Sequence, residues 1–189
     1  MKNSQLKTLQ DTNLADNNAN AITAAKLREV TTEFVKHSGG FVSYNNANST
    51  PQNLSSGVAA QLTFDTSGGS NLLTYIPYYI EVPLIASNAI QINGIADGSV
   101  INGRFLCSLT TAASNTEIKI EARFKNSSGT TIFTYPFANY SFKQSGSHTI
   151  SSTGIFYVDP TLQDGTIEFW ITSDGAATAL WSSIMLDIR

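Results

Sequence analysis

The chain has 189 residues, with 11 basic and 14 acidic side chains and a formal net charge of −3. Its single cysteine and two histidines exclude an intramolecular disulfide and a Cys/His zinc cluster. No basic run marks a nucleic-acid surface, and no long apolar run predicts a membrane span or a signal peptide. We therefore expect no nucleic-acid partner and no membrane insertion. Charged residues are only 13%, which predicts a polar but weakly charged surface.

The first 21 residues are polar and rich in Asn and Asp, with few side chains to bury. This composition cannot bury enough apolar surface to offset the entropy of ordering the chain. We therefore predict that residues 1–21 form a flexible arm, which a partner could order.

A helix is predicted over residues 24–37, where Thr23 is a good N-cap and strong helix formers follow. Leu27, Val30 and Phe34 follow 3–4 spacing and make one apolar stripe. A helix of about 14 residues is marginal alone in water, so the stripe must pack on something. Two interpretations stay open: packing on its own sandwich, or packing on copies of itself in a short bundle.

The clearest strand is Glu117–Lys125, in which apolar and charged residues alternate over the whole stretch. Successive side chains of a strand point to opposite faces, so this strand has a buried face and a charged, solvated face. On the strand predicted at 100–111, Phe105, Cys107 and Leu109 are expected to face inward. Turn signals at intervals of roughly ten residues divide residues 41–189 into eight or more short strands, the pattern of a sandwich or barrel. Four of these short strands are predicted between residues 131 and 159.

Two strands carry large apolar side chains on both faces. In the strand at 166–172, Trp170 stands opposite the apolar face, and in the strand at 179–188, Trp181 and Met185 do. A strand that is apolar on both faces is buried on both faces, so something outside the sandwich must cover it. We favour a subunit interface, since large exposed apolar patches are unusual on monomers. The alternative is a loop or the helix folded over that sheet.

Motifs for catalysis are absent from the sequence: it has neither a nucleophile elbow nor a Gly-rich phosphate loop. Glu117 and Glu121 share a strand face, as a glycosidase pair could, but they lie among basic residues on what should be a solvated face. We therefore expect no enzyme, no cofactor and no metal. Trp170 and three tyrosines could form a sugar-stacking platform, although such aromatics are more often core or interface. The tyrosines are Tyr75, Tyr78 and Tyr79.

Two stretches resemble a known family. The segment ADNNANAITAAKLREV (15–30) resembles the polar-then-helical opening of phage virion appendage proteins. The segments GSVINGRFLCSLTTAASNTEIKIEARF (98–124) and FKQSGSHTISSTGIFYVD (142–159) are similar to the TNF-like jelly-roll knobs of phage head and tail fibres. The chain departs from the family pattern at Lys26 and in the long loop at 48–56.

The resemblance implies a mainly-β fold: a polar arm (1–21), a trimerising helix (22–40) and a TNF-like jelly-roll β-sandwich knob (41–189). It implies a virion location and a homotrimer, attached through the arm to other virion proteins of the capsid or tail, with host surface glycans as a further partner class. The interface residues would be Leu27, Val30, Phe34, Trp170, Trp181 and Met185, and the attachment residues Leu9, Asp11 and Leu14. The alternative function is a soluble carbohydrate-binding module.

Overall fold

A computed structural model describes residues 12, 23–36, 40–45, 50–63, 73–75, 85–92, 95, 98–162 and 164–188. The described part of the chain contains the helix α2 (Ala24–Lys36) and strands in two sheets. The strands are β1 (Gly40–Asn45), β2 (Gln52–Leu54), β3 (Ala60–Gln61), β4 (Leu73–Tyr75), β5 (Ile85–Ala86), β6 (Ala89–Gln91), β7 (Val100–Thr111), β8 (Thr116–Lys125), β9 (Thr131–Phe142), β10 (Gly146–Tyr157), β11 (Thr166–Ser173) and β12 (Ala177–Ile188).

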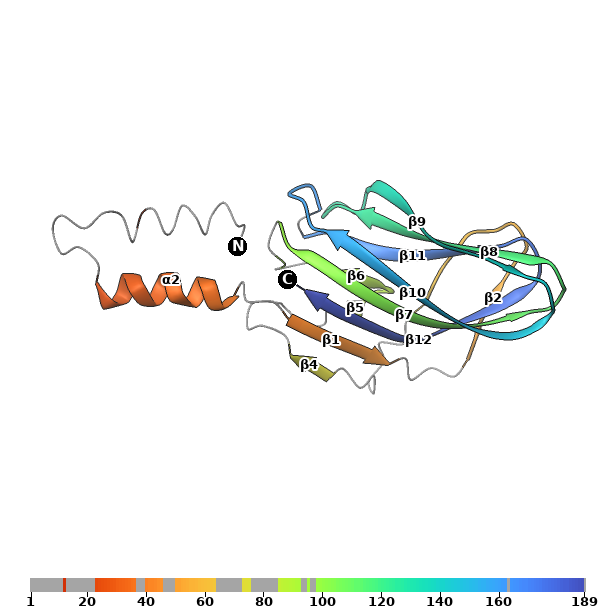
Figure 1. Ribbon diagram of the computed structural model, residues 1–189. Helices are drawn as coiled ribbons and strands as arrows, with labels where there is room; N and C mark the ends of the chain where they lie inside the picture. Colours follow the sequence, from red (N-terminus) through yellow and green to blue (C-terminus); the bar gives the residue numbers. More distant parts are fainter. Residues whose placement is uncertain are drawn as a thin grey trace.

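The two sheets form a sandwich (Figure 1), and within the described residues the named strands pair antiparallel. Sheet one has the order β10-β7-β12-β1-β4, with β2 on β12, and sheet two the order β5-β6-β11-β8-β9, with β3 on β11. Consecutive strands often lie in different sheets, as in a jelly roll, and the predicted mainly-β jelly-roll sandwich is confirmed. Since β9 and β10 each end the order of their sheets, they form one open edge of the sandwich.

Helix α2 begins where the cap signal predicts. The backbone N–H of Lys26 donates to Thr23 Oγ1 over 3.2 Å, which satisfies one donor of the first turn. Figure 1 shows α2 beyond one end of the sandwich. Along the stripe, Val30 is buried and Leu27 is 52% exposed, whereas the side chain of Phe34 lies outside the described residues. The role of the stripe in trimerisation stays a prediction.

The strand predicted at Glu117–Lys125 is confirmed as β8. Its side chains alternate between buried and more exposed positions, and the buried ones are Thr116, Ile118, Ile120, Ala122 and Phe124. On β7, Phe105, Cys107 and Leu109 face the core as predicted. Burial raises the pKa of the Cys107 thiol from 9.0 to about 12, because the core stabilises the neutral thiol over the thiolate.

The predicted position of Trp181 is wrong. The pairing register of β12 with β7 shifts between Trp181 and Ser183, and this bulge moves Trp181 to the same face as Ile184. Trp181 is 2% exposed, and its ring centroid lies 5.6 Å from those of Phe105 in sheet one and Phe169 in sheet two. It therefore belongs to the core of its own subunit and is not an interface anchor.

Trp170 and Met185 do not share a surface. Trp170 is on β11, next to β8 in sheet two, and Met185 is on β12 in sheet one. Both side chains are partly buried and face away from the core, so they lie on opposite outer faces of the sandwich. The predicted interface required the outward apolar side chains of β11 and β12 to form one patch. They cannot do so from opposite faces of the sandwich.

Candidate functional site

Five large apolar side chains stand exposed at the open edge between β9 and β10. Their exposed fractions range from 41% for Ile132 to 75% for Ile155. We call these five the edge patch: Ile132, Phe133, Tyr135, Ile155 and Tyr157. Monomeric proteins rarely expose clustered side chains of this kind, so such a patch marks an interaction site.

The strand order explains why these side chains are exposed. Phe133 and Tyr135 lie opposite Phe124 and Ala122 of β8, which face the core, but no strand lies beyond β9 in the described order of sheet two. On β10, Ile155 and Tyr157 alternate with inward-facing residues and thus point away from the core. The edge patch therefore combines two inward-facing side chains of β9, Phe133 and Tyr135, with two outward-facing side chains of β10, and Ile132 joins them at the register shift of β9.

The edge is closed near the β9–β10 turn. Tyr140 Oη and Ser152 Oγ are 2.6 Å apart, and the rings of Phe142 and His148 stack with centroids 4.1 Å apart. Farther from the turn, the Phe137 ring fills the space between β9 and β10, where it packs against the backbone of Gly154. A Cβ at that glycine would lie only 2.6 Å from the Phe137 ring, so the close approach of the strands requires glycine here.

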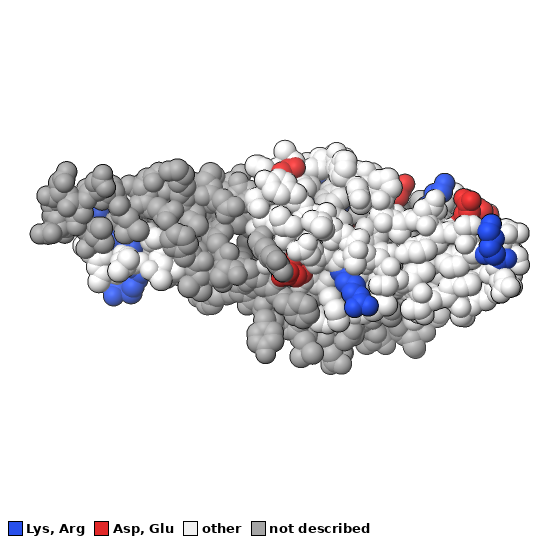
Figure 2. Space-filling view, viewed as in Figure 1, with Lys and Arg blue, Asp and Glu red and all other residues white. Residues whose placement is uncertain are grey.

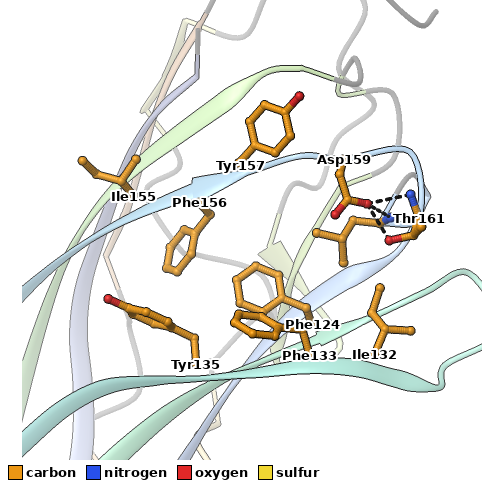
Figure 3. A pocket seen from close by; sticks show the side chains of 10 residues that line it. Phe124, Ile132, Phe133, Tyr135, Ile155, Phe156, Tyr157, Asp159 and Thr161 are labelled. Atoms are coloured by element: carbon orange, nitrogen blue, oxygen red, sulfur yellow. Dashed lines mark hydrogen bonds between the residues drawn. The ribbon is translucent and has the colours of Figure 1, made fainter.

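Past Phe137 the strands diverge and a pocket of about 400 Å³ opens. Figure 3 shows the rings of Phe124, Phe133 and Phe156 between the two strands, with Tyr135 at one side of the opening. The pocket is mostly apolar. A partner that covered it would remove this apolar surface from water, which is favourable.

Asp159 gives one end of the pocket a negative charge. Its carboxylate accepts hydrogen bonds from the hydroxyl of Thr161 and from the backbone N–H groups of Thr161 (2.7 Å) and Leu162 (3.2 Å). These bonds, the Thr161 hydroxyl first, lower the pKa of Asp159 because they favour the carboxylate. An occupant of the pocket must accommodate this carboxylate beside the apolar rings.

Trp170 belongs to a polar network on the outer face of sheet two. The nearly buried Glu168 accepts from Lys125 Nζ (2.7 Å) and from Trp170 Nε1 (2.8 Å). The Arg123 guanidinium lies 4.1 Å from the Trp170 ring centroid and 3.3 Å from Glu121 Oε2. We call Glu121, Arg123, Lys125, Glu168 and Trp170 the outer-face network. Arg123 occupies one side of the indole, so Trp170 is not an open stacking platform.

The remaining predicted site residues lie elsewhere. Leu9, Asp11, Leu14, Tyr78 and Tyr79 fall outside the described residues, as does the side chain of Tyr75. Within the described ranges, His, Cys, Asp and Glu form no group of three or more that could hold a metal ion. In the same part of the chain, no helix has the length and apolar character needed to cross a membrane.

Comparison with family models finds no match, and comparison with curated proteins finds none either. Solved structures with a similar fold include the infectious bursal disease virus VP2 subviral particle (TM-score 0.51, 11% identity, 79% of this chain and 32% of that one). Another is a chain from infectious bursal virus derived T=1 particles (TM-score 0.52, 13% identity, 79% and 31%). PRD1 vertex protein P5 aligns over 79% of this chain and 93% of its own, with 13% identity, but its TM-score of 0.41 supports no argument.

The chain thus spans about a third of the length of these two viral chains. At these identities the likeness concerns the fold alone, and it agrees with the jelly-roll topology of the two sheets.

Proposed function

We propose that this chain is a structural component of a bacteriophage particle, a homotrimeric head- or tail-associated fibre that presents its jelly-roll sandwich as a knob. The sequence resemblance to fibre knobs supports this, and so does the fold shared with the viral particle chains. The observation that carries the proposal is the edge patch, five exposed apolar side chains that an assembly would cover.

The structure of β9 favours a contact through side chains over strand pairing between copies. Pro136 lacks a backbone N–H, and the register with β8 shifts at Ile120/Glu121 and at Phe124/Lys125. Proline and bulges make an edge strand less able to form hydrogen bonds with a strand of another chain. The edge patch would therefore dock on a different surface of the next copy. Such heterologous contacts form a ring when the rotation between copies closes, and a threefold rotation gives the proposed trimer.

A surface suited to receive the edge patch is the outer face of sheet one. Leu106, Leu180 and Met185 lie there, half-buried. Serines pair with Leu106 and Leu180, and the exposed Arg104 pairs with Met185. Figure 2 shows few charged side chains on the face in view, several of them gathered near one end, so few charges would be desolvated by a contact away from that end. Met185 keeps its proposed interface role, whereas Trp170, on the outer face of the other sheet, lies away from this contact.

The N-terminal part would complete the assembly. Leu27, Val30 and Phe34 would pack on their symmetry mates in a short bundle beyond one end of the sandwich. The arm, through Leu9, Asp11 and Leu14, would attach the trimer to other virion proteins. The knob would then present its free surfaces toward host glycans.

The mass of the full chain in solution tests this proposal. Light scattering at micromolar concentration should give three times the chain mass of 20.3 kDa. The double variant Ile155→Ser/Tyr157→Ser should dissociate, because it removes the two most exposed members of the edge patch. The matched control Thr149→Ala/Ser151→Ala, exposed on the same strand, should stay trimeric.

A monomeric wild type, or a double variant that assembles like the control, would contradict the proposal. A monomer that binds sugar would favour the second candidate function, a soluble carbohydrate-binding module. The observation that favours this second candidate is the outer-face network, whose charged groups can hydrogen-bond sugar hydroxyls although Arg123 occupies one side of the Trp170 ring.

A further inference from the structure

A bulge in β9 leaves a hollow on the outer face of sheet two. Phe137 and Ala138 both turn toward the core, although they are adjacent: the Phe137 ring lies 4.9 Å from that of Phe105, and Ala138 pairs with the buried Ile120. The alternation of faces is broken at this point. As a result, no side chain of β9 covers the outer face between Pro136 and Asn139, and a hollow of about 340 Å³ opens there.

Residues with three kinds of polar side chain line this hollow. Lys119 lies opposite Asn139, and Glu121 lies opposite Pro136, in the pairing of β8 with β9. The rim thus carries an ammonium, an amide and a carboxylate, and the proline ring adds an apolar wall. A few convergent polar groups beside apolar surface, in a hollow of this size, are the features of small-ligand sites.

The carboxylate of Glu121 is held in place before any ligand arrives. Arg123 binds Glu121 Oε2 at 3.3 Å and lies over the Trp170 ring. Trp170 in turn donates to Glu168, which is 8% exposed and also paired with Lys125. The outer-face network therefore connects a nearly buried carboxylate to the rim of the hollow. Groups fixed in this way lose less side-chain entropy on binding.

We propose that the hollow at Lys119, Glu121, Pro136 and Asn139 binds a neutral saccharide. The Glu121 carboxylate accepts from neighbouring sugar hydroxyls, the Lys119 ammonium donates to them, and the Asn139 amide does both. The Pro136 ring provides apolar contact for the C–H face of the sugar ring. These groups both accept and donate hydrogen bonds, which matches the hydroxyl groups of a neutral sugar, each of which can do both.

This inference deepens the proposed presentation of the knob to host glycans by naming the residues that bind the sugar. It rests on the proposed function only for the location of the hollow on the outside of the particle. Binding to the free protein can be measured whether or not the chain is a trimer, so the two proposals fail separately.

Saturation-transfer NMR of the full chain tests the site with four probes: the methyl α-glycosides of glucose, galactose and mannose, and N-acetylglucosamine. At least one probe should bind, and Glu121→Gln and Asn139→Ala should each weaken its binding at least tenfold. Glu117→Gln is the matched control, because Glu117 is exposed on the same face of β8 but outside the hollow. Its affinity should equal that of the wild type.

Three results would overturn the inference. The first is no saturation transfer to any of the four probes. The second is unchanged affinity in both Glu121→Gln and Asn139→Ala. The third is tighter binding of the anionic sugar N-acetylneuraminic acid than of every neutral probe, which would show that the ligand class is wrong. Light scattering on the same samples separates loss of binding from loss of assembly, and thermal unfolding of each variant confirms that it is folded.

Discussion

Replacing Trp181 with alanine should destabilise the fold of each subunit, whether or not the subunits are assembled. The indole is 2% exposed and lies between rings of both sheets, with centroids 5.6 Å from Phe105 and 5.6 Å from Phe169. The substitution removes the largest fully buried side chain of the sandwich and leaves a cavity between the sheets.

The expected loss is large compared with the stability of a domain. Trp→Ala changes in cores cost about 3–5 kcal/mol, which combines the lost transfer free energy with the cavity. The total stability of a domain is roughly 5–15 kcal/mol. Met185→Ala provides the control, because Met185 lies on the same strand but on the outer face. Its cost to the isolated subunit should stay below about 1.5 kcal/mol, since the side chain is only half-buried.

Urea unfolding followed by circular dichroism measures both variants at several equal protein concentrations, because assembly makes apparent stability depend on concentration. For Trp181→Ala, the midpoint should fall at every concentration with little change in slope. The reasoning would be refuted if Trp181→Ala unfolded within about 1 kcal/mol of the wild type while its trimer dissociated. That result would place the indole between subunits.

Two further predictions concern the interior. Gly154→Ala should lower the unfolding free energy by about 1–3 kcal/mol, because its Cβ would lie 2.6 Å from the Phe137 ring. Thr149→Ala, on the same strand, should lower the unfolding free energy less. Equal losses in the two variants would contradict the contact between residue 154 and Phe137. For Cys107, the folded pKa of about 12 lies above the ordinary 9.0, so the stability that the neutral thiol contributes should be fully present below pH 9.0 and fall as pH rises toward about 12. Cys107→Ala should lack this fall in urea titrations, and a native thiol that reacts with maleimide at pH 8 as fast as the unfolded one would refute its burial.

Local patterns predicted the features that depend only on neighbours in the chain. The alternation in Glu117–Lys125 identified both faces of β8, because side chains of a strand alternate whatever it pairs with. Thr23 marked the start of α2 in the same way, since an N-cap bonds within the first turn. The inward position of Cys107 followed from the same alternation.

The faces predicted from the alternation of apolar and polar residues are wrong where a strand contains a bulge. The register shift after Trp181 exchanged the faces of β12, and the bulge at Phe137 opened the hollow beside Glu121. The four short strands predicted between 131 and 159 are two long ones, β9 and β10. A bulge inserts one residue to fit the partner strand, so the partner strand decides where it falls.

The sequence by itself determined that residues 41–189 fold into β-strands after a capped helix, and which face of a regular strand is apolar. Only the tertiary structure decided which strands lie at an edge. Phe133 and Tyr135 face the core side of their sheet, as their neighbours do, yet they are exposed because β9 is last in the described order of its sheet. Strand order depends on contacts between residues far apart in the chain. The edge patch and the hollow, which carry both proposals, therefore became visible only in the folded sandwich.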